Sequence, residues 1–200
     1  LCMSKNKLVF ANWKMNLDIN SSNKLIKEIL DRNLNYENID VVIAPPFVYL
    51  SEINNMLINS RLKLSAQNVF YNDNGEFTGE ISHEMLKDLG CSWVMIGHSE
   101  RRIHLFETNE MVNKKIIFSC NKSFNIIFCV GESNEERQKG KTFEIIKNQI
   151  SESLKGVDDK YLHKIVIGYE PIWAIGSGVT PDLKDIQETH NVINYHLKEI

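Results

Sequence analysis

The feature that most constrains the fold of this chain is a regular alternation of short apolar runs with longer stretches of helical pattern. The short runs are rich in Val, Ile and Leu, as buried parallel strands are, and the longer stretches repeat apolar residues at helical spacing. Strand alternating with helix implies right-handed crossovers and a parallel sheet of the α/β class. Strands are predicted at Leu8–Ala11, Val41–Ala44, Leu64–Ala66, Trp93–Ile96, Ile126–Val130 and Ile165–Tyr169, and helices at Ser22–Leu30, Leu50–Ile58, His83–Leu89, Glu110–Ser119, Thr142–Leu154 and Asp182–Glu199.

Two architectures share this pattern, the open doubly wound sheet and the closed (β/α)₈ barrel. No Gly-x-Gly-x-x-Gly follows the first predicted strand, which disfavours the dinucleotide-binding fold. Polar residues suited to chemistry instead follow several different strands, as in a barrel with its site at the C-terminal rim. No Pro-, Gly- or Ser-rich linker divides the chain, so residues 1–200 are predicted to form a single domain.

Composition excludes several functional classes. Of the 200 residues, 42% are hydrophobic and 24% are charged, as in ordinary globular domains, and the net charge of −3 disfavours a nucleic-acid-binding surface. No apolar run approaches membrane-spanning length, and Leu1–Lys7 has no apolar signal-peptide core. The scattered cysteines lack metal-ligand spacing, which favours reduced, buried thiols and a cytoplasmic location. They are Cys2, Cys91, Cys120 and Cys129.

The segment after the sixth predicted strand has the properties of a catalytic lid. Ile165–Tyr169 is apolar on both faces and reads as a buried strand, and Glu170 stands at its end. Pro171 stiffens the exit, and the apolar run Ile172–Ile175 leads into the hinge Gly176–Gly178. A lid that excludes water would raise the pKa of the carboxyl, so that Glu170 could act as a base near neutral pH. The alternative is an ion-paired glutamate beside a hydrophobic turn.

Two further polar clusters follow strands one and four. Lys14 can hold an anionic substrate as a point charge, and Asn12 can orient that substrate by hydrogen bonding, although most loop lysines are simply solvated. His98 stands where a short helical turn begins, and the amides there disfavour the charged imidazolium. A neutral imidazole can donate to a substrate carbonyl oxygen and polarise it.

The long loop Gln67–Ser82 is semi-apolar and contains Phe70 and Phe77. A loop of this length in a compact barrel usually has a function, and aromatic residues on it suit docking into a partner subunit. A loop packed on itself is an equally good interpretation of the same residues.

Taken together, these segments resemble the triosephosphate isomerase family. The similarity lies in the runs Ala11–Asn16, Gly97–Arg102 and Glu170–Gly178, supported by Ala44–Leu50 and Cys129–Ser133, in the right order along nearly the whole chain. The resemblance implies a TIM barrel that interconverts dihydroxyacetone phosphate and D-glyceraldehyde 3-phosphate in glycolysis and gluconeogenesis. It implies neither metal nor organic cofactor, and no nucleic-acid or membrane partner.

The resemblance also implies residue roles, and because the family is itself a standard case of pKa tuning, the acid–base scheme is taken over from it. Glu170 would be the base, and neutral His98 the group that polarises the carbonyl. Substrate binding would fall to Asn12, Lys14 and the amide of Gly176. Glu100 would support the cluster electrostatically near Lys14, and Thr78 would make the dimer contact of a homodimer formed through Gln67–Ser82. Cys129, Arg101 and Arg102 would be structural.

One departure from the family concerns length, because a complete barrel takes about 250 residues and eight strands. This sequence accounts for about the first six β/α units, so we expect an incomplete, open barrel with unpaired edge strands, a half-built phosphate site and low activity. Two alternatives stay open: an inactive or incomplete barrel fragment, and another phosphosugar isomerase on the same fold.

Overall fold

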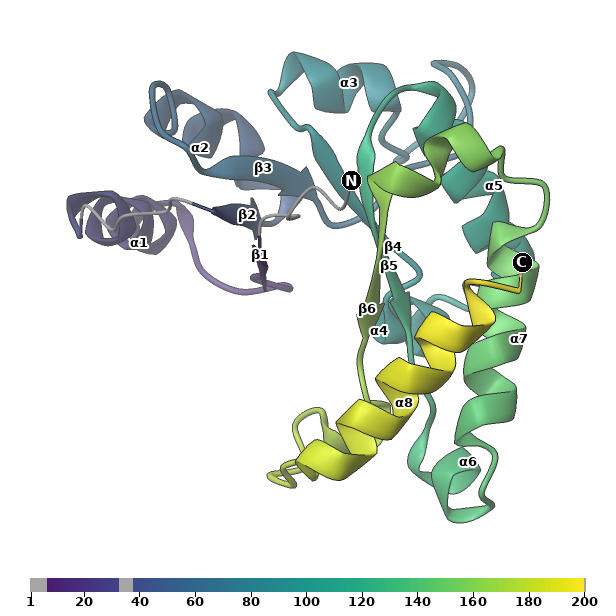
Figure 1. Ribbon diagram of the computed structural model, residues 1–200. Helices are drawn as coiled ribbons and strands as arrows, with labels where there is room; N and C mark the ends of the chain where they lie inside the picture. The colour runs from purple at the N-terminus through teal and green to yellow at the C-terminus, as the bar shows by residue number, and fades with distance from the viewer. Residues whose placement is uncertain (1–6, 33–37, 200) are drawn as a thin grey trace. The chain divides into compact units, whose positions relative to one another are not determined.

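The computed structural model describes residues 7–32 and 38–199 of the chain, and in this part strands and helices alternate as predicted (Figure 1). Every predicted strand is present to within two residues at each end, and every pairing described below is parallel. The α/β class is therefore confirmed. The strands are β1 Lys7–Asn12, β2 Ile39–Ala44, β3 Lys63–Ala66, β4 Trp93–Ile96, β5 Asn125–Val130 and β6 Ile165–Tyr169.

The described chain divides into two compact units. The first unit comprises the described residues of Leu1–Met95 together with Lys122–Asn125, and the second comprises those of Ile96–Asn121 and Ile126–Ile200. Compact units within one chain can belong to one domain, so the single domain over residues 1–200 stays a prediction.

The first unit is built on the pairing of β1 with β2. Their register runs from Lys7 opposite Ile39 to Asn12 opposite Ala44, and β2 continues to β3 and β3 to β4. The apolar run at the end of β2 is buried, as expected for a strand with neighbours on both sides. The helices of this unit are α1 Ile19–Asp31, the 3₁₀ turn η1 Phe47–Tyr49, α2 Leu50–Met56 and α3 His83–Asp88.

The second unit is built on β5 and β6, which pair from Ile126 opposite Ile165 to Val130 opposite Tyr169. Helix α7 packs against α5 and α8 (Figure 1) and buries Ile146 and Ile150, which are four residues apart and so lie on one helical face. The helices are α4 Ser99–His104, α5 Asn109–Asn121, α6 Asn134–Gln138, α7 Thr142–Leu154, η2 Asp159–Lys164, η3 Ile172–Ala174 and α8 Leu183–His196.

Side-chain caps fix where several helices begin. Asp18 accepts a hydrogen bond from the Ser21 amide at the start of α1, and Ser82 accepts from Met85 at the start of α3. Helix α6, which was not predicted, begins with a capping box between Ser133 and Glu136. The Ser-x-x-Glu spacing is the sequence signal that could have found it.

Two predictions about α8 are wrong in detail. The predicted start at Asp182 is one residue too early, because Asp182 is the N-cap, its carboxylate accepts from the Lys184 amide, and the helix begins at Leu183. The predicted end at Glu199 is also too late, since the helix ends at His196. The Asp182 carboxylate satisfies an amide of the first helical turn that has no partner within the helix, and this contact fixes where the helix begins.

The prediction of a fully buried β6 is also wrong. Val166 is 36% exposed, and the rest of the strand is only half-buried. Within residues 7–32 and 38–199, β6 has β5 as its only strand neighbour, so apolar composition alone did not guarantee burial.

The cysteine prediction holds for the residues that are described. Cys91, Cys120 and Cys129 are free thiols and are buried, whereas Cys2 lies outside the described residues. Burial raises the pKa of the Cys91 thiol to about 12. In the part of the chain that is described, no helix is both long enough and apolar enough to cross a bilayer.

Candidate active site

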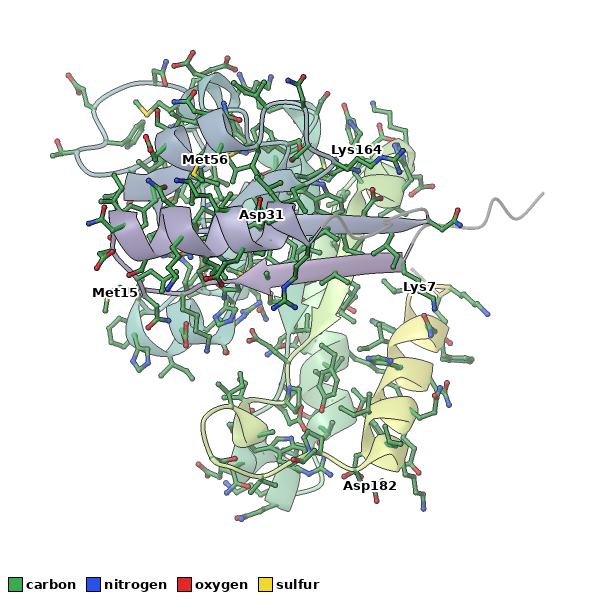
Figure 2. The ribbon with its side chains drawn as sticks, turned by 90° about the vertical axis from the view of Figure 1, so that its left-hand side faces the viewer. Lys7, Met15, Asp31, Met56, Lys164 and Asp182 are labelled. Atoms are coloured by element: carbon green, nitrogen blue, oxygen red, sulfur yellow. The ribbon has the colours of Figure 1, made fainter. Side chains whose placement is uncertain are left out.

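In the first unit, Asn12 is the last residue of β1, and Lys14 lies in the loop that follows, where the backbone is constrained. Lys14 has φ 55°, a left-handed conformation that side chains larger than glycine rarely adopt. The Asn12 carboxamide oxygen accepts from the Lys14 amide at 2.9 Å, and Gln67 donates to the carbonyl oxygens of Lys14, at 2.9 Å, and Ala44, at 2.8 Å. Met15, labelled in Figure 2, is 95% exposed. These contacts fix the backbone position from which the Lys14 side chain projects. Gln67, which makes two of them, was not predicted as a supporting residue.

In the second unit, His98 stands at the N-cap of α4, as predicted. Its Nδ1 accepts from the Glu100 amide at 3.3 Å, so the proton of the neutral ring lies on Nε2. Nε2 lies 3.1 Å from a carboxylate oxygen of Glu170, and the Glu100 carboxylate lies 3.6 Å from Nδ1. The ring therefore points its N–H at the candidate base.

Glu170 follows β6, and both of its carboxylate oxygens are engaged. Oε1 accepts from the Ser99 amide at 2.6 Å, while Oε2 accepts from the Ser99 hydroxyl at 3.0 Å and faces His98. The prediction named Ser99 only as part of a motif. Its position directly after His98, at the start of a helical turn, was the sequence signal that could have identified Ser99 as a partner of the site.

Burial raises the pKa of the Glu170 carboxyl above its ordinary value, while His98 and the hydrogen bonds from Ser99 act in the opposite direction. The side chain is 16% exposed, so desolvation outweighs these contacts. A carboxylate with a raised pKa is a stronger base than an ordinary one, as proton abstraction near neutral pH requires.

The end of β5 lies directly against the backbone of Glu170. The carbonyl oxygen of Val130 accepts from the Glu170 amide at 2.9 Å. At Gly131, a Cβ would stand 1.9 Å from the Glu170 carbonyl oxygen, so only glycine fits. The buried thiol of Cys129 has a pKa well above its ordinary value because of desolvation, which favours the predicted packing role over a nucleophilic one.

The lid segment, Pro171–Gly178, is tied to a buried carboxylate. Glu132 is fully buried and accepts from the Trp173 indole N–H at 2.9 Å and from the Tyr169 hydroxyl at 3.1 and 3.2 Å. Arg137 lies 3.5 Å from Glu132 and stacks over the Trp173 ring at 4.2 Å. Glu132 was not predicted as a site residue. At the far end of the lid, Gly176 is exposed with φ 67°, the conformation that a glycine hinge supplies.

The loop Gln67–Ser82 is partly packed on itself and partly exposed. The rings of Phe70 and Phe77 lie 4.7 Å apart, and Lys122 forms a 2.6 Å ion pair with Asp73. Thr78 is exposed near the end of the loop. These contacts hold part of the loop in place and leave Thr78 accessible.

The predicted residues thus fall into two clusters. Asn12 and Lys14 belong to the first unit, and His98, Glu100 and Glu170 come together in the second. Arg101 lies 3.4 Å from the buried carboxylate of Glu107, in keeping with a structural ion pair. Among the described residues, no group of three or more His, Cys, Asp or Glu side chains is arranged to hold a metal ion.

Comparison with known proteins gives one consistent result. The family model described as triosephosphate isomerase matches residues 7–200. The triosephosphate isomerase of Dictyoglomus thermophilum is 45% identical over 196 residues, which are 98% of this chain and 79% of the relative. That of Thermoanaerobacter pseudethanolicus is 44% identical over 181 residues, covering 90% and 73% of the two chains. That of Alkaliphilus metalliredigens is 46% identical over 188 residues, covering 94% and 74%.

Proposed function

Because this chain belongs to the triosephosphate isomerase family, we propose that it interconverts dihydroxyacetone phosphate and D-glyceraldehyde 3-phosphate, with Glu170 and His98 as its catalytic residues. The observation that carries the assignment is the 3.1 Å approach of His98 Nε2 to a buried Glu170 carboxylate. A desolvated base beside a neutral imidazole donor is what an enediolate mechanism needs.

Glu170 removes a proton from the carbon beside the substrate carbonyl and returns it to the neighbouring carbon. His98 donates its Nε2 proton toward the carbonyl oxygen, which stabilises the negative charge that develops there, and moves protons between the two oxygens of the enediolate. The carboxylate must leave Ser99 and His98 to reach carbon, so substrate binding replaces the contacts that hold Glu170 in this structure.

Lys14 and Asn12 supply positive charge and a hydrogen-bonding group for the anionic substrate. The amide of Gly176 binds the phosphate when the lid closes, and closure keeps water from the reactive intermediate. Glu100 adds negative charge beside His98. The match of all these motifs to one family supports these residue roles.

The same family membership supports a cytoplasmic homodimer. The loop Gln67–Ser82 is the dimer arm, and exposed Thr78 reaches the partner subunit. Buried free thiols at Cys91, Cys120 and Cys129 suit a reducing compartment.

Exchange of the substrate's α-proton with deuterated solvent tests the proposed function. Glu170→Gln keeps the shape of the side chain and removes the base, so the exchange rate is expected to fall by at least ~10²-fold. The circular dichroism spectrum and the affinity for a phosphate-bearing competitive inhibitor are expected to stay near the parent values.

Glu135→Gln serves as the control, because it makes the same substitution at an exposed residue of α6. Exchange at the parent rate in Glu170→Gln would refute the assignment of the base. Absence of exchange in the parent chain itself would refute the proposed function.

A further inference from the structure

Gln149 reaches from α7 to the residue after β5 and makes a reciprocal pair of hydrogen bonds with the backbone N–H and C=O of Gly131. The Gly131 amide donates to the Gln149 side-chain oxygen at 2.9 Å, and the Gln149 side-chain nitrogen donates to the Gly131 carbonyl oxygen, also at 2.9 Å. Gly131 is buried, so without Gln149 both of these backbone groups would lose a partner away from bulk water.

Gly131, the residue that Gln149 binds, lies directly against the backbone of Glu170. The Gly131 α-carbon is so close to the Glu170 carbonyl oxygen that a Cβ would overlap it. The preceding residue, Val130, accepts from the Glu170 amide. A shift of Gly131 therefore moves the backbone from which the Glu170 carboxylate projects.

The next residue, Glu132, holds the lid segment through its backbone and its side chain. The Glu132 carbonyl oxygen accepts from the Ile172 amide at 3.2 Å, and its carboxylate holds Trp173. The segment Val130–Glu132 thus supports the base through its first two residues and the lid through its third.

We propose that Gln149 is a positioning residue of the isomerase, which fixes the segment Val130–Glu132 and through it both Glu170 and the lid. This inference rests on the proposed function for its consequence in catalysis. Its structural part, that Gln149 sets the position of the Glu170 backbone, stands on the hydrogen bonds alone.

The chemistry explains why a carboxamide is needed here. The side chain must offer one donor and one acceptor at the same time, which a neutral amide does. Leucine has a similar size but leaves both groups of Gly131 without a partner. A carboxylate could accept from the Gly131 amide, but its second oxygen would face the Gly131 carbonyl oxygen and repel it.

Amide hydrogen exchange tests the structural part without any need for activity. In Gln149→Leu, exchange at Gly131 and Glu170 is expected to accelerate at least tenfold relative to the other strand amides of β5 and β6. Gln187→Leu makes the same substitution on an exposed residue of α8 and is expected to leave both amides unchanged. Parent-like protection of the Gly131 and Glu170 amides in Gln149→Leu would overturn the inference.

The variant Gln149→Glu adds a readout that loss of packing alone would not produce. The carboxyl group that it introduces regains a donor when it is protonated, so the Gly131 amide chemical shift is expected to return toward the parent value as the pH falls. A Gly131 shift that stays displaced on protonation, or that never differed from the parent, would contradict the paired hydrogen bonds.

Steady-state kinetics test the consequence for catalysis. A small displacement of a catalytic base slows proton transfer strongly. The kcat of folded Gln149→Leu is therefore expected to fall roughly 10- to 100-fold, with a smaller change in KM. Parent kcat together with loosened amides would show that Gln149 is only structural and would overturn the positioning role. If the parent chain has no isomerase activity, the proposed function fails, while the exchange data still decide what Gln149 holds.

Discussion

At the scale of single residues, the state of Glu170 depends on a balance between burial and two hydrogen-bond partners. Desolvation raises the pKa of its carboxyl, and His98 and Ser99 lower it. The Ser99 hydroxyl is the one partner that can be removed without disturbing the backbone of α4, because the Ser99 amide bond to Oε1 remains.

Ser99→Ala is therefore expected to raise the pKa of Glu170 further, since it removes a hydrogen bond to the charged form. The acidic limb of the pH profile of kcat/KM of the free enzyme is expected to move to higher pH. Ser51→Ala, at an exposed serine of α2, is the control. An acidic limb at the parent position in Ser99→Ala would contradict this account of the Glu170 carboxylate.

His83, at the start of α3, makes the stability of the first unit sensitive to acid. The ring is buried against Phe124, and desolvation, followed by the nearby charges of Lys122 and Lys87, lowers its pKa to about 4. The folded state therefore binds a proton less readily than the unfolded chain, whose histidine titrates near 6.5. Stability is fully present above that value and is lost as the pH falls from about 6.5 toward 4.

The loss attributable to His83 is expected to be on the order of 2–3 kcal/mol at pH 4. His83→Phe keeps an aromatic ring against Phe124 and cannot titrate, so its free energy of unfolding is expected to fall less over the same pH range. Urea denaturation of both proteins at pH 7 and pH 4.5 measures the difference. Equal losses in parent and variant would show that His83 does not contribute to the acid sensitivity.

At the scale of elements, the loop Gln67–Ser82 carries the proposed dimer contact. Within the loop, Phe77 packs on Phe70 and Asp73 pairs with Lys122, while residues 72–80, Thr78 among them, remain exposed to a partner. A loop that is held in place yet accessible suits insertion into a partner, because little conformational entropy is lost on docking.

Deletion of Asn72–Gly75 is expected to convert a dimer to a monomer in sedimentation velocity experiments. Thr78→Arg, which places a charge on the exposed part of the loop, is expected to weaken the dimer at least tenfold without deleting chain. Asn148→Arg adds the same charge to an exposed position of α7 and serves as the control. A dimer of unchanged stability in both loop variants would place the arm elsewhere.

At the scale of the whole molecule, the chain crosses between the two compact units three times. Residues Lys122–Asn125 return to the first unit between two stretches of the second, and both β4 and β5 contribute residues to each unit. Neither unit is a continuous stretch of chain, so neither can be removed by a single cut.

This connectivity leads us to expect one cooperative unfolding transition for the chain, as predicted for a single domain. Differential scanning calorimetry is expected to give equal van't Hoff and calorimetric enthalpies, and fluorescence and circular dichroism are expected to report coincident transitions. Two resolved calorimetric transitions would contradict the single-domain prediction.

The class of fold and the order of its strands and helices could be predicted from local sequence patterns. Alternating β-like and helical patterns located each strand found in residues 7–32 and 38–199, because local backbone preferences and apolar spacing act within a few residues. Glu170 and His98 could be proposed as catalytic residues because each stands in a motif that resembles the triosephosphate isomerase family.

The tertiary structure alone decided what surrounds those groups. Ser99 binds Glu170 across 71 positions of sequence, Trp173 reaches Glu132 across 41, and Gln149 reaches Gly131 across 18. Hydrogen bonds of this kind depend on distances set when helices and strands pack, and no local pattern encodes those distances. The same reason explains the exposed Val166, since burial depends on which strands and helices lie beside a strand as well as on its own residues.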